Sequence, residues 1–197
     1  MKNLIIKGNC KVGNKVYLFN LPPLKTCTPT KWCTHGRNGK PACYALRNNF
    51  LLSSVTKSLN ERYELSKRNY FVDRMSNEIN KAKALYFRIH SSGDFYSKTY
   101  VNKIHQIVKN CPNTLFRTTT RRLDLIKPIE KLNSLPNMIV RESLDYIRTK
   151  PVTKLNFTAL TKLDIAKKRK CYLCKEDCEE CGYYCWLHRC NVKFNEF

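Results

Sequence analysis

The sequence predicts an α/β protein whose core is a parallel sheet, either open or curled into a partial (β/α) barrel, with an N-terminal hairpin and a cysteine-rich, metal-binding C-terminal segment. Three observations lead to this prediction. Strand-like apolar runs alternate with helix-like periodicity between residues 84 and 160, which is typical of consecutive βαβ units. Two short apolar runs flank Gly13-Asn14 near the start of the sequence. Six of the 11 cysteines fall within residues 171–190.

Length and composition limit how the chain is organised. Its 197 residues suit one domain with a small appendage, and 42% hydrophobic residues exclude wholesale disorder. We assign residues 1–165 to the α/β domain, which includes a cysteine loop at 27–43, and residues 166–197 to a basic linker and a cysteine-rich tail. No stretch approaches the roughly 18 consecutive apolar residues of a membrane helix, and no apolar signal region opens the sequence. A cytoplasmic protein without a membrane partner is therefore expected.

The individual elements follow from apolar spacing and capping residues. Phe71, Met75 and Ile79 fall at i, i+4 and i+8, so one helix face is expected to be buried. Asn60 and Ser97 are the expected N-caps of two helices. Strands are expected at 4–6, 16–19, 84–90, 114–120, 138–143 and 155–160. Helices are expected at 44–52, at 60–82, after Ser97 and around 123–132.

The positive charge predicts a polyanionic partner. The chain carries a net charge of +22, and residues 1–60 contain no Asp or Glu. Such a field favours salt-sensitive binding to DNA or RNA. The alternative is a charge that serves only solubility. The residues chosen for nucleic-acid binding are Arg121, Arg122, Lys167, Lys168, Arg169 and Lys170.

The C-terminal cysteines predict a metal site. Thiols of a cytoplasmic protein stay reduced, so closely spaced cysteines indicate a metal more often than disulfides. The spacing C-x2-C-x3-C-x2-C-x3-C suits either structural zinc or an iron-sulfur cluster, and the crowding favours iron-sulfur. The expected ligands are Cys171, Cys174, Cys178, Cys181 and Cys185. Whether Cys10, Cys111, His188 and Cys190 are ligands stays open, the alternative for the three cysteines being buried thiols.

A second candidate metal site lies in the N-terminal loop. Cys27, Cys33 and Cys43 precede the βα units, in a segment whose lysines and arginines would stabilise thiolates. Three cysteine ligands to a 4Fe-4S cluster would leave one iron free for a substrate or cofactor. His35 would instead complete a Cys3His zinc site, and the third alternative is that these cysteines pack in the core.

The end of the strand at 84–90 provides candidate catalytic residues. His90 and Asp94 follow the strand and precede a helix, where they would act as a general acid/base pair or hold a metal for phosphodiester chemistry, with Arg88 beside them. Gly93 permits an unusual backbone conformation. The structural alternative is that Asp94 caps the next helix and His90 satisfies a buried hydrogen bond.

Three strands share an arginine two residues before a small or polar side chain. Arg88, Arg117 and Arg141 would point to one face near the carboxyl ends of their strands. Ligand sites of parallel α/β folds gather at that end, so Arg117 and Arg141 are expected to bind a carboxylate or phosphate of a cofactor. The alternative is an outer face, where the arginines pair with acidic residues of helices.

Ordered motifs along most of the chain resemble the phage gene-product-88 family. The resemblance depends on Leu21-Pro22 through Cys27, then Cys33 and Cys43-Tyr44-Ala45, the run RIHSSGDFYS at 88–97, and Cys178-x2-Cys181-x3-Cys185-Trp186. It implies an origin in a phage or mobile element, and so a cytoplasmic location in the host. It implies no established activity.

A looser likeness is to radical S-adenosylmethionine enzymes. These enzymes combine a three-cysteine loop with a partial (β/α) barrel and a Gly-Gly-Glu-type loop after the second strand. The likeness implies that Cys27, Cys33 and Cys43 hold the cluster and that Ser92, Gly93 and Asp94 bind the cofactor, S-adenosylmethionine. The usual CxxxCxxC spacing is absent here.

Two functions from different classes follow from the sequence. The first is a phage or mobile-element iron-sulfur protein, radical-SAM-like, that acts on nucleic acid or on a target bound to nucleic acid. The second is a zinc-stabilised basic protein that binds nucleic acid in replication, nicking or inhibition of a host defence. A host protein is a further expected partner.

Overall fold

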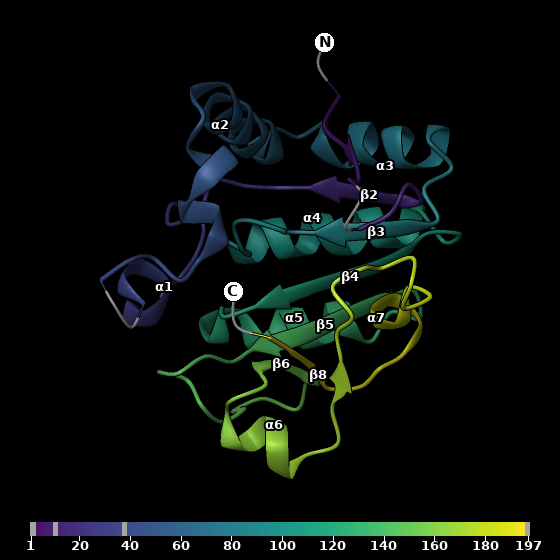
Figure 1. Ribbon diagram of the computed structural model, residues 1–197. Helices are drawn as coiled ribbons and strands as arrows, with labels where there is room; N and C mark the ends of the chain where they lie inside the picture. The colour runs from purple at the N-terminus through teal and green to yellow at the C-terminus, as the bar shows by residue number, and fades with distance from the viewer. Residues whose placement is uncertain (1–2, 10–11, 37–38, 196–197) are drawn as a thin grey trace.

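The computed structural model describes residues 3–9, 12–36 and 39–195. In this part of the chain, eight strands form one open sheet in the order β1-β2-β3-β4-β5-β6-β8-β7 (Figure 1). Strand β1 is antiparallel to β2, and every other neighbouring pair is parallel. The strands are β1 (Ile6–Lys7), β2 (Val16–Phe19), β3 (Tyr86–Ile89), β4 (Leu115–Thr120), β5 (Met138–Ser143), β6 (Phe157–Leu160), β7 (Tyr172–Leu173) and β8 (Val192–Phe194). The expected mostly parallel sheet and N-terminal hairpin are confirmed.

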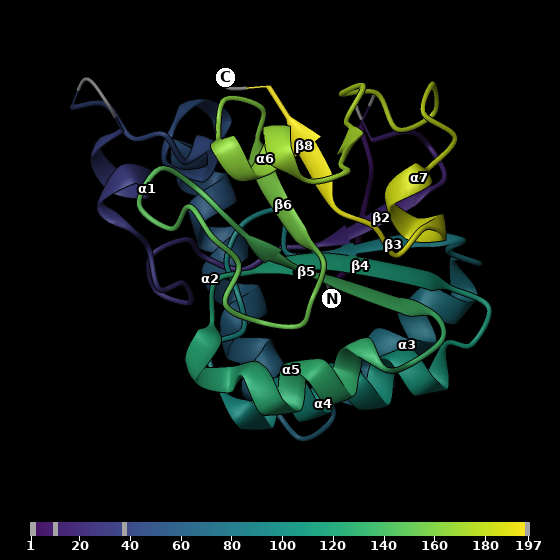
Figure 2. The same cartoon turned by 90° about the horizontal axis from the view of Figure 1, so that it is seen from below.

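The helices divide between the two faces of the sheet. They are α1 (Lys31–His35), α2 (Ser53–Lys67), α3 (Phe71–Lys81), α4 (Lys98–Asn110), α5 (Ile126–Asn133), α6 (Asp164–Lys168) and α7 (Tyr184–Leu187). Figure 2 shows α3, α4 and α5 covering one face, with α6 on the other side beside β6 and β8, and α7 also on that side, near β2 and β3. Short 3-10 helices span Tyr44–Leu46, Asn48–Leu51 and Leu123–Leu125. None of the helices in the described ranges is long and apolar enough to cross a bilayer.

The main core lies between the sheet and α3, α4 and α5. Alternate residues of the strands, such as Phe87 and Phe116, meet the apolar faces of these helices, where Ile79 and Ile104 are almost fully buried. Burying each such side chain contributes about 1.5–3 kcal/mol. Because successive strand residues point to opposite faces, Arg88 and the other arginines lie on the face away from these helices.

The helix expected at 60–82 is two helices, α2 and α3, because the chain extends at Arg68 (φ −68°, ψ 151°). Lys103 of α4 donates from Nζ to the carbonyls of Ser66, Lys67 and Arg68 at 3.0, 2.8 and 2.8 Å. These bonds satisfy carbonyls at the end of α2 that have no partner inside the helix. Asn60 lies inside α2 rather than at its N-cap.

Two other segments also have helix boundaries that differ from those expected. The segment expected as a helix at 44–52 forms two 3-10 helices, and α2 begins only at Ser53. The cysteine loop contains one short helix, α1, whose N-cap Thr30 accepts a hydrogen bond from the backbone N–H of Cys33. Ser97 caps α4 as expected, by accepting from the backbone N–H of Tyr100.

The C-terminal segment is built into the sheet. Strand β8 lies between β6 and β7, so β7 pairs only with β8 in the described part of the chain. Helix α7 packs near the amino ends of β2, β3 and β4, where Trp186 donates from Nε1 to the carbonyl of Phe87 at 3.1 Å. Residues 166–195 therefore share the sheet of the preceding residues.

Candidate functional site

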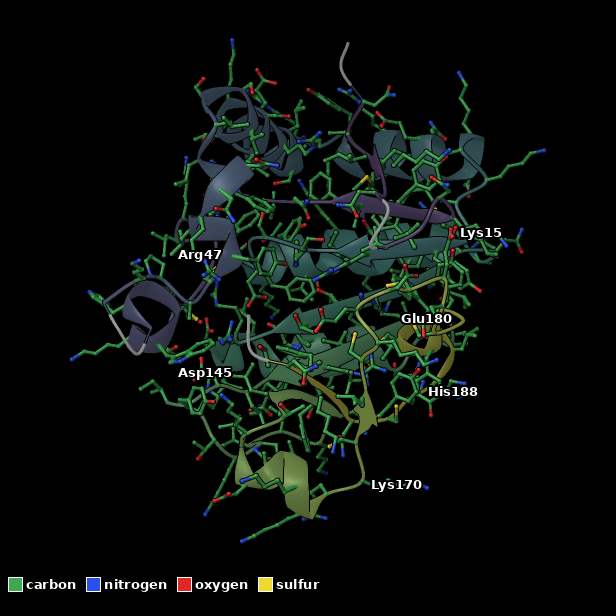
Figure 3. The ribbon with its side chains drawn as sticks, in the orientation of Figure 1. Lys15, Arg47, Asp145, Lys170, Glu180 and His188 are labelled. Atoms are coloured by element: carbon green, nitrogen blue, oxygen red, sulfur yellow. The ribbon has the colours of Figure 1, made fainter. Side chains whose placement is uncertain are left out.

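The carboxyl ends of β2, β3, β4 and β5 lie at one edge of the sheet, and the segments that follow them meet there. The cysteine loop follows β2, the segment 90–97 follows β3, and Arg121 and Asp145 follow β4 and β5. Figure 3 places Arg47 and Asp145 at this edge near α1, with Glu180 and His188 at the opposite edge. This carboxyl edge is where parallel α/β folds gather ligands.

Asp94 links two of the segments that meet at this edge. Its carboxylate accepts hydrogen bonds from Thr120 Oγ1 at 2.8 Å and from the backbone N–H groups of Phe95 and Arg121 at 2.7 and 2.8 Å. Burial raises the pKa of Asp94, and these three donors oppose the rise. Asp94 thus joins the end of β3 to the end of β4, whereas Ser97 caps the next helix.

The segment around Gly93 is fastened to the start of the cysteine loop. Leu21 N–H donates to the carbonyl of Ser92 at 3.0 Å, and Ser92 Oγ donates to the carbonyl of Leu21 at 2.8 Å. Thr26 Oγ1 accepts from the backbone N–H of Asp94 at 3.3 Å. Gly93 has φ +81°, and a Cβ there would lie 2.6 Å from Leu21 Cβ. The close approach of the two segments therefore depends on glycine.

The three N-terminal cysteines gather at the same edge. The backbone N–H of Cys43 donates to the carbonyl of Cys33 at 3.1 Å. Burial raises the pKa of Cys27 to about 11, with smaller contributions from Asp94 and Cys43. Burial also raises the pKa of Cys43, which Arg121 opposes. Without a bound cation, Cys27 and Cys43 are thus protonated at neutral pH, so metal binding would release their protons.

Asp145 is a member of this site that the sequence analysis missed. Its side chain is fully buried, and Oδ2 accepts from Thr30 Oγ1 at 2.7 Å and from Cys33 Sγ at 3.9 Å. Arg121 Nε lies 3.3 Å from Oδ2. Asp145 follows β5 as Asp94 follows β3, and this shared position at a strand end was the available signal. The arrangement places a carboxylate and a guanidinium beside the cysteine loop.

His90 points away from this site. It is buried in the helix-covered core, where Nε2 lies 2.8 Å from Tyr100 Oη and the ring packs edge-on against Phe95. Burial lowers the pKa of His90 to about 3. Tyr100, the partner of His90, also feels the charge of Asp94, but no hydrogen bond joins His90 to Asp94, so the acid/base pairing of these two residues stays a prediction.

The lowered pKa of His90 predicts how the stability of the fold depends on pH. The unfolded chain takes up a proton near pH 6.5, which the folded chain accepts only near pH 3, so stability falls as pH drops between these values. The slope contributed is up to about 1.4 kcal/mol per pH unit. Urea unfolding of His90→Asn, which tolerates the positive φ of 64°, should show a shallower loss between about pH 6 and pH 4. Equal slopes in the two proteins would contradict this assignment.

The three arginines share a face but have different partners. Arg88 donates to Tyr44 Oη at 3.4 Å, near the carboxyl edge. Arg117 lies over the Trp186 ring at 4.1 Å, and its pKa is lowered by burial and Arg88 but raised by Cys185 and Cys178. Arg141 is fully buried and donates to three backbone carbonyls of the C-terminal segment. Arg117 and Arg141 both contact the C-terminal segment here. These contacts do not test cofactor binding by the two residues, which stays a prediction.

The basic residues predicted to bind nucleic acid fall into two groups. Arg122 holds Asp124 through Nε and Nη2 at 2.8 and 2.6 Å and donates from Nη1 to the carbonyl of Phe95, while Arg121 pairs with Asp145. The run 167–170 is exposed at the end of α6 and just beyond it. The first group holds the carboxyl edge together, and the second is open to a partner.

The C-terminal cysteines lie away from the carboxyl edge. Cys185 is buried in the cluster that covers the first residues of β2, β3 and β4, with Cys174 and Cys178 packed against it. Burial raises the pKa of Cys178 to about 11, and Arg117 opposes the rise. The two groups of cysteines thus occupy different places and would form separate sites.

All ten cysteines in the described ranges are free thiols, as a reduced protein would have them, and Cys10 lies outside those ranges. Within residues 3–9, 12–36 and 39–195, no three Cys, His, Asp or Glu side chains converge closely enough to hold a metal ion. Metal binding at either group therefore requires the thiols to draw together around the ion.

The fold and this edge define an α/β protein with an open, mostly parallel sheet and a carboxyl edge that carries cysteines and buried carboxylates. A comparison with protein families matches residues 3–180 to the family described as gene product 88. The chain belongs to that family, as its motifs indicated. Searches among curated proteins and among solved structures found no match.

Proposed function

We propose that the chain is a phage or mobile-element iron-sulfur protein, in which Cys27, Cys33 and Cys43 hold a cluster at the carboxyl edge, and that it acts on nucleic acid or on a target bound to it. One observation carries this proposal: the loop after β2 brings three cysteines to the carboxyl edge, against the segment that follows β3. The family match gives no support to a likeness with radical S-adenosylmethionine enzymes. Binding of S-adenosylmethionine is therefore proposed from the sequence likeness alone.

The surroundings of the three cysteines support a bound cation. Asp145 and Thr30 lie against Cys33, and Asp94 lies close enough to Cys27 to affect its pKa. Three thiolates would add negative charge to these carboxylates, which the cations of a cluster and the Arg121 guanidinium would balance. Cys43 feels the charge of Arg121 already. A bound cluster would supply electron transfer or a reactive iron at this edge.

The residues beside the cysteines have definable tasks. Tyr44 follows Cys43 and donates a hydrogen bond from its hydroxyl to the carbonyl of Ser91, while Arg88 donates to the same hydroxyl. Ser92 and Gly93 hold the cysteine loop at its start through Leu21. These contacts would fix the position of the three thiols relative to the segment after β3. A cofactor bound between them would then be held in one orientation.

Anaerobic purification followed by analysis of iron, sulfide and zinc tests the N-terminal site. About four irons per chain with equal sulfide are expected for one cluster. Replacing Cys27, Cys33 and Cys43 with serine should remove that iron and the absorption near 400 nm while the protein stays folded. The matched control is Cys111→Ser, whose thiol is buried beside Ser76 in the helix-covered core. If the triple variant kept as much iron and sulfide as the unchanged protein, the assignment of these ligands would be refuted.

The C-terminal cysteines are proposed to hold a second metal with a structural task. Trp186, Tyr183 and Cys185 pack on the sheet, so a metal there would strengthen an existing contact. Serine at Cys178, Cys181 and Cys185 should therefore lower the free energy of unfolding, whereas serine at the N-terminal cysteines should leave it largely unchanged. Equal losses of stability in the two sets would contradict this division.

Zinc without iron would favour the second candidate, a zinc-stabilised protein that binds nucleic acid. The exposed run 167–170 supports that candidate, because these four basic side chains are open to a phosphate backbone. Affinity for nucleic acid should fall steeply between low and moderate salt under either candidate. An affinity that does not respond to salt would contradict the charge argument for both.

A further inference from the structure

A pocket opens beside the N-terminal cysteines, on the outer side of α1. It has a volume of about 350 Å³ and is lined by Lys31, Trp32, His35, Gly36 and Ile147. Cys33 is the next residue after Trp32 and turns inward toward Asp145. Helix α1 therefore presents a cysteine to the site already described and an aromatic ring to this pocket.

One aromatic ring, that of Trp32, lines the pocket and also packs against Tyr146. The Trp32 and Tyr146 rings lie 5.6 Å apart at an interplanar angle of 57°. Among the described residues, no acceptor pairs with Trp32 Nε1, although this atom is buried. Because this atom has almost no accessible surface, an occupant of the pocket would meet the face of the Trp32 ring rather than its N–H group.

The charge around the pocket matches an anionic occupant. Lys31 and His35 line it, whereas Arg148, just after Ile147, donates from Nη1 to the carbonyl of Arg121 at 3.0 Å. Asp145 is the carboxylate next to this segment, and its oxygens already accept from Thr30, Ile147 and Arg148. Residues 1–60 contribute no acidic side chain at all. A phosphate of the occupant would therefore meet cations rather than a free carboxylate.

We propose that this pocket binds one base of a single-stranded nucleic acid, stacked on Trp32, with its phosphates held by Lys31 and its neighbours. Base stacking on aromatic side chains combined with basic residues is the usual way in which proteins hold single strands. A base inside a duplex could not present its face to Trp32, which explains the choice of single strands. The inference rests on the proposed action on nucleic acid and names where the strand lies relative to Cys33.

Fluorescence titration of the full chain tests the pocket directly. The chain has two tryptophans, and Trp186 is buried against Arg117, so quenching by a bound base should come from Trp32. The probes are oligo-dT and oligo-U of about 12 nucleotides, a length within the usual site sizes. We expect quenching by both probes, and about tenfold weaker binding of Trp32→Leu at the same salt concentration. The conservative variant Trp32→Phe should retain most of the affinity.

Two comparisons make the result specific. Tyr70→Leu removes an exposed aromatic side chain from a different pocket, between α2 and α3, and should leave the affinity unchanged. A duplex of the same length should bind Trp32→Leu and the unchanged protein equally. Equal affinity of Trp32→Leu and the unchanged protein for both single strands would overturn the proposal, provided the thermal unfolding of the variant is unaltered. If Trp32→Leu does not fold, an absence of quenching in the unchanged protein would overturn the proposal instead.

The outcome for the pocket is separable from that for the cluster. Binding is measured on protein whose iron content has been determined, and Trp32→Leu should keep its iron. Iron without Trp32-dependent binding would overturn the pocket and leave the cluster standing. Trp32-dependent binding without iron would support the pocket and overturn the cluster.

Discussion

Replacing Arg141 with methionine is expected to lower the free energy of unfolding by about 3–5 kcal/mol, because three backbone carbonyls around the buried guanidinium would each lose a charged donor. The guanidinium donates to the carbonyls of Cys185, His188 and Cys190 at 3.0, 2.6 and 2.8 Å, and only 1% of the residue is exposed. Urea unfolding measures the loss. Limited proteolysis should then cut the segment after Arg169 faster than in the unchanged protein.

Arg169→Met is the control for this change. Arg169 is an exposed residue at the end of α6, so the same substitution should alter stability by less than about 0.5 kcal/mol. Arg141→Lys should fall between the two, since one ammonium cannot reproduce the planar donors that reach three carbonyls. A stability of Arg141→Met close to that of Arg169→Met would show that the C-terminal segment is held in another way.

Replacing Gly93 with alanine is expected to separate the segment after β3 from the cysteine loop. The added Cβ would lie 2.6 Å from Leu21 Cβ, 2.7 Å from Thr26 Oγ1 and 2.9 Å from the carbonyl oxygen of Leu21. The two Leu21 atoms can move only if the backbone moves. The left-handed backbone adds about 1 kcal/mol of strain. A loss of about 2–4 kcal/mol and of bound iron should follow, measured by urea unfolding and by metal analysis.

Gly39→Ala separates the two causes. Gly39 also has a positive φ, of 73°, but among the described residues no atom lies within 4 Å of the Cβ that alanine would add. This variant should lose only about 1 kcal/mol and keep its iron. Similar losses of iron in both variants would mean that the cysteine loop depends on flexible backbone rather than on the contact with Gly93.

Local patterns predicted most of the sheet. The runs at 84–90, 114–120 and 138–143 became β3, β4 and β5, because short apolar strands bounded by polar residues carry their own signal. The break between α2 and α3 could not be predicted in this way. It depends on Lys103, which lies 35 residues beyond Arg68 and supplies the donors that end α2.

The candidate site shows the same limit more clearly. The cysteine loop and the segment after β3 were each expected to carry site residues, but no pattern in the sequence predicted that they contact each other. The position of Asp145 after a strand was the only local signal for it, and its contact with Thr30 could not be predicted because the two residues lie 115 positions apart in the sequence. The partners of Arg141 lie 44 to 49 residues away for the same reason. Periodicity predicts which face a side chain takes, but not which distant segment will cover that face.

The position of β8 between β6 and β7 affects the order in which the chain can be completed. While the protein is being synthesised, β7 emerges before any strand exists with which it pairs, because Val192–Phe194 is made later. The sheet from β2 to β6 can assemble first, since its strands pair in the order of synthesis, and β8 must then add at the exposed edge of β6. The cysteines between β7 and β8 therefore remain open to water and to metal ions until this last strand has paired. A nascent chain could therefore bind the metal proposed for these cysteines before that half of the sheet forms.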